Sequence, residues 1–247
     1  MRPNVKRIIT KSVLSVLFAS LSASVWPGVF TVTPVRIYMT PQDRAIAVTV
    51  TNDGDETLVM QADIYEWKQK PNGEDDLTLS EDLFLSPPIL KVAPKSRQVV
   101  RLARVKKAQQ GPREITYRLI VREIPEAKPA NKDIQVQIAL AFSMPVFITP
   151  PGAKSALNCS ATRLSADKVQ ATCENTGNAH SHPTSLLLTN ITGDKIANQD
   201  IGAYILPDIK RNFELQRKDG SIPAGKAKLA VSLVDGTTQT FDVVIGQ

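Results

Sequence analysis

Short runs with the alternating pattern of β-strands recur along almost the whole chain, and strong amphipathic helices are missing. Turn-forming residues separate these runs at the spacing that is typical of β-sandwiches. The sequence Pro150–Gly152 falls where the pattern restarts. These features predict an all-β protein built from two antiparallel β-sandwiches joined near residue 150. The expected strands are Arg44–Thr51, Leu58–Trp67, Gln98–Ala103, Ile115–Val121, Ile134–Ile148, Leu157–Leu164, Lys168–Asn175, Thr184–Thr189, Lys228–Leu233 and Gln239–Ile245.

Residues 1–28 have the features of a secretory signal peptide. Basic residues between Arg2 and Lys11 precede a short apolar run at Ser12–Ser24. This run is too short for a comfortable transmembrane helix, and no other segment approaches the roughly 20 apolar residues that a span requires. We expect cleavage between about Ala23 and Gly28, which releases an exported chain without membrane insertion.

The net charge gives little reason to expect a nucleic-acid partner. The formal charge is +6, and four basic residues of the signal segment account for four of these charges, so +2 remains for the mature chain. No arginine-rich helix, zinc module or aromatic RNA-reading motif is apparent in the sequence. Nucleic-acid binding is therefore not expected.

The chain has two cysteines, and both lie in its second half. Cys159 and Cys173 fall on neighbouring predicted strands, separated by the hairpin turn expected at Ser165–Asp167. In an oxidising compartment these cysteines should form a structural disulfide. Redox activity would instead favour a close Cys-x-x-Cys pair or an activating neighbour.

Motifs that suggest catalysis are weak. The segment Gly220–Ala227 is close to a phosphate-binding loop, but it lacks the final Ser or Thr, and the following residues have a strand pattern rather than a helix pattern. The histidines are His180 and His182, and two ligands do not make a catalytic zinc site. No Gly-x-Ser-x-Gly sequence is present. We expect no enzyme activity, no cofactor and no metal, with the histidines on an exposed edge or loop.

Residues 134–147 show the clearest alternation in the chain. Their second face carries Gln, Ala and Ser rather than charge. Such a strand either fills the core of its own domain or is offered to a partner. The apolar positions are Val136, Ile138, Leu140, Phe142 and Met144.

Several further segments resemble, in the same order, the periplasmic chaperones of the chaperone–usher pilus assembly family, which are PapD-like proteins. Arg122–Pro125 followed by Gln137–Leu140 is the most specific pair. The other matching segments are Phe30–Tyr38, Val48–Asn52, Pro87–Pro88, Val92–Ser96, Val100–Leu102, Glu114–Leu119 and, more diffusely, Glu174–Asn178 and Val234–Gly236.

The resemblance implies two immunoglobulin-like domains set at an angle, in a boomerang shape with a cleft between them. The expected division is a signal peptide at 1–28, an N-terminal chaperone domain at 29–149 and a C-terminal domain at 150–247. The implied function is to bind pilus or fimbrial subunits in the periplasm and to deliver them to an outer-membrane usher. The strand 134–147 would complete the unfinished fold of the subunit by donor-strand complementation.

In this family an arginine on the first strand and a lysine on the lending strand hold the subunit's terminal carboxylate. Arg36 matches the arginine, but the lysine position falls at Pro145, which has no charge. Arg118, on the strand expected to pair with the lending strand, is a candidate replacement, because an arginine binds a carboxylate with two hydrogen bonds. The alternative is that Arg118 pairs internally with Glu114 and that Arg36 is a solvated charge on its strand.

The family also has a charge cluster between its domains. Glu114 and Asp235 match the acidic members, and the arginine position is Thr149. Either Arg118 supplies the missing cation or the domain angle is held differently.

Three other functions are alternatives. One is a secreted two-domain β-sandwich that binds carbohydrate or a protein ligand, but a carbohydrate-binding sandwich would usually show exposed aromatic platforms, and aromatic residues make up 5% of the chain. A pilus subunit would be a single incomplete domain, and a metallohydrolase would depend on His180 and His182. The sequence leaves open which subunit is bound and whether the free chain caps its own strand by dimerising.

Overall fold

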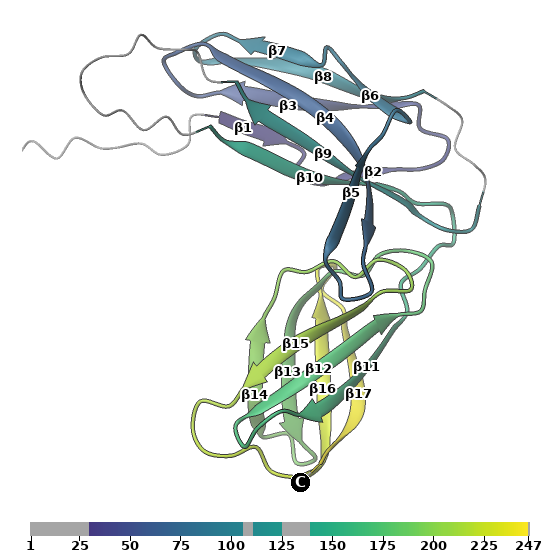
Figure 1. Ribbon diagram of the computed structural model, residues 1–247, viewed down its shortest axis with the longest axis vertical. Helices are drawn as coiled ribbons and strands as arrows, with labels where there is room; N and C mark the ends of the chain where they lie inside the picture. The colour runs from purple at the N-terminus through teal and green to yellow at the C-terminus, as the bar shows by residue number, and fades with distance from the viewer. Residues whose placement is uncertain (1–29, 106–110, 125–138, 247) are drawn as a thin grey trace, which may run out of the picture.

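The computed structural model describes residues 30–105, 111–124 and 139–246, and every regular element within these ranges is a β-strand. The strands form two β-sandwiches, one above the other and set at an angle (Figure 1). We call residues 30–148 the first sandwich and residues 157–245 the second sandwich. The all-β, two-sandwich fold that the sequence predicts is confirmed.

Two sheets form the first sandwich. One has the strand order β1-β3-β8-β6, and the other has the order β2-β10-β9-β4-β5, with β7 also paired to β4. The first sheet contains β1 (Phe30–Thr33), β3 (Ala45–Asn52), β8 (Ser96–Arg104) and β6 (Leu83–Ser86). The second contains β2 (Ile37–Met39), β10 (Ala141–Ile148), β9 (Ile115–Glu123), β4 (Leu58–Gln69), β5 (Asp75–Leu79) and β7 (Ile89–Val92).

The second sandwich also consists of two sheets, with the orders β11-β12-β15 and β14-β13-β16-β17. The residues after the segment that is close to a phosphate-binding loop form a strand, as the sequence predicts. This strand already begins at Gly225, so Lys226 lies in it and not in a turn before it. The strands are β11 (Leu157–Arg163), β12 (Lys168–Asn175), β13 (Pro183–Asn190), β14 (Lys195–Asp200), β15 (Lys210–Gln216), β16 (Gly225–Leu233) and β17 (Thr238–Ile245).

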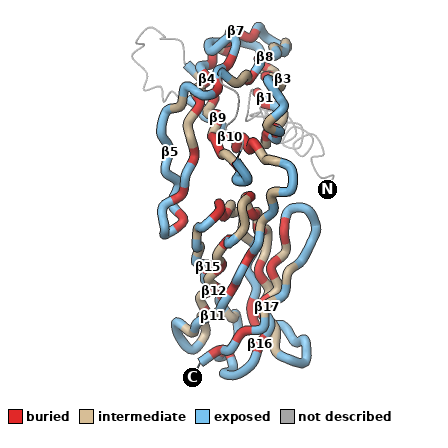
Figure 2. Tube along the Cα trace, turned by 90° about the vertical axis from the view of Figure 1, so that its right-hand side faces the viewer, coloured by how far each residue is buried: buried red, intermediate tan, exposed pale blue. Residues whose placement is uncertain are grey.

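Each sandwich has its own apolar core, because alternate side chains of each strand point inward. In β3, Val48 and Val50 are fully buried, whereas Thr49 between them is half-buried. The same alternation is visible along the strands of both sandwiches in Figure 2. Apolar burial of this kind is the main driving force that holds two sheets together.

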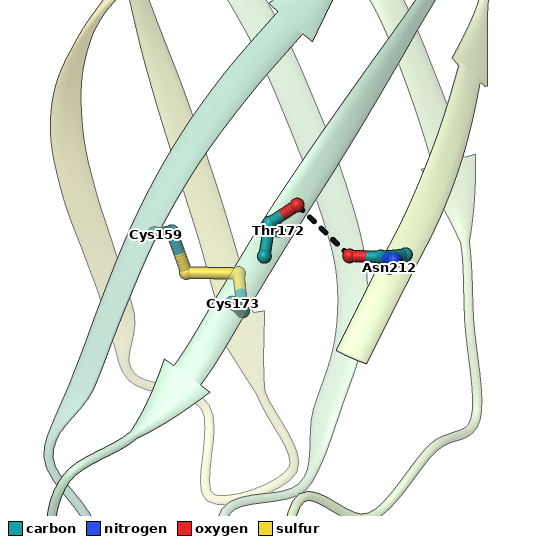
Figure 3. The surroundings of a disulfide bond; sticks show 4 residues. All are labelled: Cys159, Thr172, Cys173 and Asn212. Carbon is teal, nitrogen blue, oxygen red and sulfur yellow. Dashed lines mark hydrogen bonds between the residues drawn. A yellow bond between two sulfur atoms is a disulfide. The ribbon is translucent and has the colours of Figure 1, made fainter. Parts of the chain in front are cut away.

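A disulfide joins Cys159 and Cys173, as the sequence predicts (Figure 3). The two residues face each other directly across the antiparallel pair β11–β12. On the neighbouring pair, Thr172 donates a hydrogen bond to Asn212 on β15 over 2.9 Å. The disulfide therefore fixes the hairpin within the second sandwich.

The β4–β5 hairpin reaches from the first sandwich to the second (Figure 1). Near its tip the side chain of Gln69 donates to the backbone oxygen of Tyr204 over 3.1 Å and accepts from the backbone N–H of Leu206 over 3.0 Å. The hairpin thus ties the two sandwiches together. Among the residues described, none forms a helix with the length and apolar character needed to cross a bilayer.

Candidate functional site

One edge of β10 is open over half of the strand. On one side β10 pairs with β9 along its whole length, from Ala141 to Ile148. On the other side β2 pairs with only its last three residues, Val146–Ile148. Within the described part of the chain, the segment Ala141–Pro145 therefore has no second neighbour, so its outward backbone groups are free to pair with another strand.

Apolar side chains lie beside this open edge. Leu140 is 38% exposed and Phe142 is 37% exposed, although the Phe142 ring also contacts Phe30 at a centroid distance of 4.9 Å. Val136 and Ile138, the other residues expected to be presented, lie outside the described residues. The open edge therefore has an exposed apolar face at the point where the described strand begins.

The side chain of Met144 is buried within its own domain, although the sequence predicts that it is presented to a partner. Its side chain is 3% exposed and belongs to the core of the first sandwich. The reason is its position, because Met144 is one alternation from Val146 and lies where the facing sheet still covers β10. On the apolar face of this strand, Met144 therefore packs in the core of the first sandwich, whereas Phe142 and Leu140 are exposed.

Arg118 lies next to the position where the resemblance expects a lysine. In the β9–β10 register, Arg118 is the direct partner of Pro145. Its guanidinium carbon is 3.7 Å from the centroid of the Trp67 ring, and its Nη2 atom is 3.3 Å from a carboxylate oxygen of Asp75. Arg118 therefore does not pair with Glu114, and its ion pair is with the β4–β5 hairpin instead.

Arg118 is largely buried, with 13% of its side chain exposed. Burial lowers the pKa of Arg118, and the negative charge of Asp75 partly offsets that effect. An arginine nevertheless stays charged at physiological pH. Its Nε atom is buried without a hydrogen-bond partner among the described residues. This cation thus retains hydrogen-bonding capacity that the free chain does not use.

Arg36 lies in the bend between β1 and β2 and is half-buried. It makes no hydrogen bond or ion pair within the described ranges. Its charge acts on His182 and Tyr204 of the second sandwich, and the charge of Arg118 also acts on Tyr204. Arg36 and Arg118 therefore both lie near Tyr204, on the side of the first sandwich that faces the second.

Glu114 links the two sandwiches through hydrogen bonds rather than through a charge cluster. One carboxylate oxygen accepts from the Thr149 hydroxyl over 2.6 Å. The other accepts from the backbone N–H of His180 over 2.9 Å and lies 2.8 Å from its Nδ1 atom. A carboxylate acceptor at this distance corresponds to the His180 tautomer that has its proton on Nδ1. Asp235 instead accepts from Thr237 in its own turn, and no contact between Asp235 and Glu114 is found among the described residues.

The two histidines differ from the exposed loop that the sequence predicts, because both are half-buried between the sandwiches. The His180 ring stacks on Phe147 at 3.6 Å, and the His182 ring stacks on Tyr204 at 4.1 Å. Burial lowers the pKa of His182 to about 4, and the charges of Arg36 and His180 act in the same direction. No group of three or more His, Cys, Asp or Glu side chains in the described part of the chain is placed to hold a metal.

A family model described as "Pili and flagellar-assembly chaperone, PapD N-terminal domain" matches residues 29–154. No curated protein matches the sequence significantly. Among solved structures, the complex of chaperone CsuC with the tip adhesion subunit CsuE, from the archaic chaperone–usher Csu pili of Acinetobacter baumannii, contains a similar chain. That match has 18% identity and a TM-score of 0.64, and it covers 89% of this chain and 100% of that chain.

Two other solved structures have a similar fold. The E. coli chaperone DraB has 19% identity and a TM-score of 0.57, with 86% of this chain and 94% of that chain covered. The complex of the Salmonella enterica pilin SafA with the chaperone SafB gives 13% identity and a TM-score of 0.57, with 87% of this chain and 95% of that chain covered. At these identities the likeness shows a shared fold.

Proposed function

The chain belongs to the family of pili and flagellar-assembly chaperones that have the PapD N-terminal domain, and on this premise we propose that it captures fibre subunits by donor-strand complementation. Residues 29–149 act as the strand-donating domain and residues 150–247 as the second domain. The chain works in the periplasm after removal of residues 1–28, which lie outside the described residues, and passes its client to an outer-membrane usher.

The open edge of β10 is the observation that carries this proposal. A client that lacks a strand can pair its backbone with Ala141–Pro145, and the hydrogen bonds of that pairing do not depend on sequence. Leu140 and Phe142 then enter apolar pockets of the client. We propose that Val136 and Ile138, which lie outside the described residues, continue this alternation when the client is bound. Burial of each such side chain contributes about 1.5–3 kcal/mol before the costs of association.

Arg36 and Arg118 are the proposed anchor for the client's C-terminal carboxylate. Both are charged, both lie on the side of the first sandwich that faces the second, and Arg118 stands beside Pro145, where the resemblance places a lysine. A charge-assisted hydrogen bond is roughly twice as strong as a neutral one. The anchor would fix the register of the client along β10.

The solved relatives support a protein client. The CsuC–CsuE structure is named as a chaperone bound to a tip adhesion subunit, and the SafA–SafB structure as a pilin bound to its chaperone. These names describe the partners of CsuC and SafB. Because this chain shares their fold over most of its length, we propose that its client is also a fibre subunit.

Co-purification from the periplasm, with mass spectrometry of the bound proteins, tests the proposal. We expect a small secreted β-protein with the unaltered chain and a loss of at least tenfold with Leu140→Asp, because a charge buried in an apolar pocket costs several kcal/mol. The control is Leu164→Asp, since Leu164 is exposed in the turn between β11 and β12.

Equal recovery of the client with both variants would contradict strand donation. If no client is recovered even with the unaltered chain, a secreted β-sandwich that binds another ligand becomes the better explanation. Circular dichroism of each variant shows whether the fold is intact.

A further inference from the structure

Tyr204 of the second sandwich lies against the proposed carboxylate anchor of the first. It is half-buried in the segment between β14 and β15. Its ring centroid is 5.6 Å from the guanidinium carbon of Arg118 and 5.4 Å from the Trp67 ring, which it meets edge-on. The ring also stacks on His182 and lies near the rings of Phe147 and His180. Tyr204, a residue of the second sandwich, therefore lies beside Arg118, a cation of the first sandwich.

The position of Tyr204 is fixed by bonds to its backbone. Its carbonyl oxygen accepts from Gln69 of the first sandwich over 3.1 Å and from Arg211 over 3.4 Å. The next residue, Ile205, pairs with Ser181 in an isolated antiparallel bridge. The ring therefore cannot move away from Arg118 without breaking bonds within and between the sandwiches.

The hydroxyl group of Tyr204 is a free donor. No hydrogen bond to it is found within the described residues, although the backbone of the same residue has two. Burial raises the pKa of Tyr204, while the charges of Arg36 and Arg118 oppose that shift. A phenol remains protonated at physiological pH under these conditions and donates one hydrogen bond.

Neighbouring polar atoms are also unsatisfied in the free chain. Trp67 Nε1, Arg118 Nε and His182 Nδ1 are buried and have no hydrogen-bond partner among the described residues. Buried polar groups usually find partners, and exceptions often mark sites of function. The neutral His182 adds no charge of its own here. The two arginines, together with the free donors on Tyr204, Trp67 and Arg118, therefore form surroundings that favour the binding of an anion.

We propose that Tyr204 is a third anchoring residue, whose hydroxyl donates a hydrogen bond to the client's C-terminal carboxylate while Arg36 and Arg118 supply the positive charge. This inference rests on the proposed function, and it adds that the second sandwich takes part in capture. The client's end would then be read by both sandwiches at once, and the angle between them would affect affinity.

The test compares binding of a synthetic peptide of alternating valine and serine residues in two forms, one with a free C-terminal carboxylate and one with an amide. Fluorescence anisotropy gives the ratio of the two affinities for the unaltered chain and for Tyr204→Phe. That substitution keeps the ring and its stacking on His182. The control, Tyr65→Phe, removes a hydroxyl that accepts from Arg122 instead.

We expect Tyr204→Phe to weaken binding of the acid about tenfold, which is the effect of losing one hydrogen bond to a charged group. Binding of the amide should stay the same, as should both affinities in Tyr65→Phe. An unchanged acid-to-amide ratio in Tyr204→Phe, together with a ratio that collapses in Arg118→Ala, would overturn the role of Tyr204 and leave the arginine anchor intact.

Failure of the proposed function would look different. If neither Arg36→Ala nor Arg118→Ala changes the acid-to-amide ratio, no carboxylate anchor exists in the cleft, and the inference falls with it. If neither form of the peptide binds the unaltered chain, strand pairing at β10 is itself contradicted. Thermal unfolding of each variant confirms that the compared proteins are folded.

Discussion

At the scale of single residues, the side chains between the sandwiches combine charged guanidinium groups with neutral rings. Arg118 is held between the Trp67 ring and the Asp75 carboxylate, so its position is fixed before any client arrives. A prearranged cation binds an anion with less loss of conformational entropy than a mobile one. The ion pair with Asp75 is half-exposed and is weakened by solvent and salt, so a client carboxylate can compete for Arg118.

The lowered pKa of His182 should make the folding stability of the chain depend on pH. Its pKa is about 4 in the folded chain, and a histidine in an unfolded chain has a pKa of about 6.5. Between these values the unfolded chain binds more protons, so the contribution of His182 to stability is present above pH 6.5 and is lost as the pH falls toward 4. We expect the thermal midpoint to fall less steeply over this window in His182→Phe, which keeps a ring against Tyr204.

Differential scanning calorimetry at several pH values checks this expectation. Identical slopes for His182→Phe and the unaltered chain would show that His182 does not titrate in this way. The second histidine, His180, remains in both proteins and serves as an internal control.

The sequence identified Arg36 and Arg118 as candidates but not their surroundings. Arg118 is a candidate because it lies on the strand expected to pair with the lending strand and can bind a carboxylate with two hydrogen bonds. Its partner Asp75 is 43 residues away, and no local pattern indicates that contact. The sequence does not indicate that Tyr204 and His182 lie between the sandwiches, because their contacts form only where residues far apart in the chain meet.

At the scale of strands, β10 has two different halves. From Val146 onward it is paired on both sides, whereas from Ala141 to Pro145 it has one neighbour among the described residues. An open edge with exposed apolar residues is a hazard that proteins usually avoid. Its presence here is consistent with a strand whose second neighbour is supplied by another protein.

The disulfide predicts a local effect on stability. Closing a loop with a sequence separation of 14 residues stabilises the fold by about 3 kcal/mol in the chain-entropy model. We expect the double substitution of Cys159 and Cys173 by serine to lower the free energy of unfolding of the second sandwich by about that amount. Urea denaturation followed by circular dichroism measures it.

Removal of the disulfide should lower stability but should not affect client binding. Because β10 and Arg118 belong to the first sandwich, the double serine variant should retain its client as long as the second sandwich stays folded. Loss of the client from the folded variant would mean that the second sandwich contributes more to capture than Tyr204 alone.

Prediction from sequence was most accurate for strands that have strong local signals. The hairpin Leu157–Asn175 was placed to within one residue, because alternating residues and a polar turn mark both of its strands. β5 was not predicted, because all five of its residues are exposed and its sequence has no buried face. Such an edge strand depends on pairing with β4, and that pairing is not encoded in a periodic pattern.

At the scale of the whole molecule, the angle between the sandwiches depends on specific hydrogen bonds. Glu114 binds His180, Arg113 forms an ion pair with Asp208 over 2.6 Å, and the side chain of Gln69 bonds with the segment Tyr204–Leu206. The stacked rings of Phe147 and His180 add apolar contact at the same place. A fixed angle would keep Tyr204 close to the two arginines.

A substitution of Glu114 tests whether its hydrogen bonds hold the angle between the two sandwiches. Its side chain is fully buried, and its oxygens bond the Thr149 hydroxyl and two nitrogen atoms of His180. Glu114→Gln leaves one oxygen as an acceptor and replaces charge-assisted hydrogen bonds with weaker neutral ones. We expect a loss of about 1–3 kcal/mol in the free energy of unfolding and a broader distribution of domain angles. Small-angle X-ray scattering and urea denaturation measure the two effects.

The control is Asp235→Asn, because Asp235 bonds only within its own turn in the described structure. It should leave the scattering curve unchanged. If Asp235→Asn widened the angle and Glu114→Gln did not, the domains would be held in a way that these contacts do not explain.

The most direct test of strand donation is hydrogen–deuterium exchange of the chain with and without its co-purified client. Backbone amides on the open edge within residues 139–144 should exchange slowly only when the client is bound, because pairing gives them new carbonyl partners. Amides of β8 should be unaffected. The predicted result is slow exchange confined to residues 139–144 and to the stretch of sequence immediately before them. Unchanged exchange there, in a complex that demonstrably contains the client, would contradict donor-strand complementation by β10.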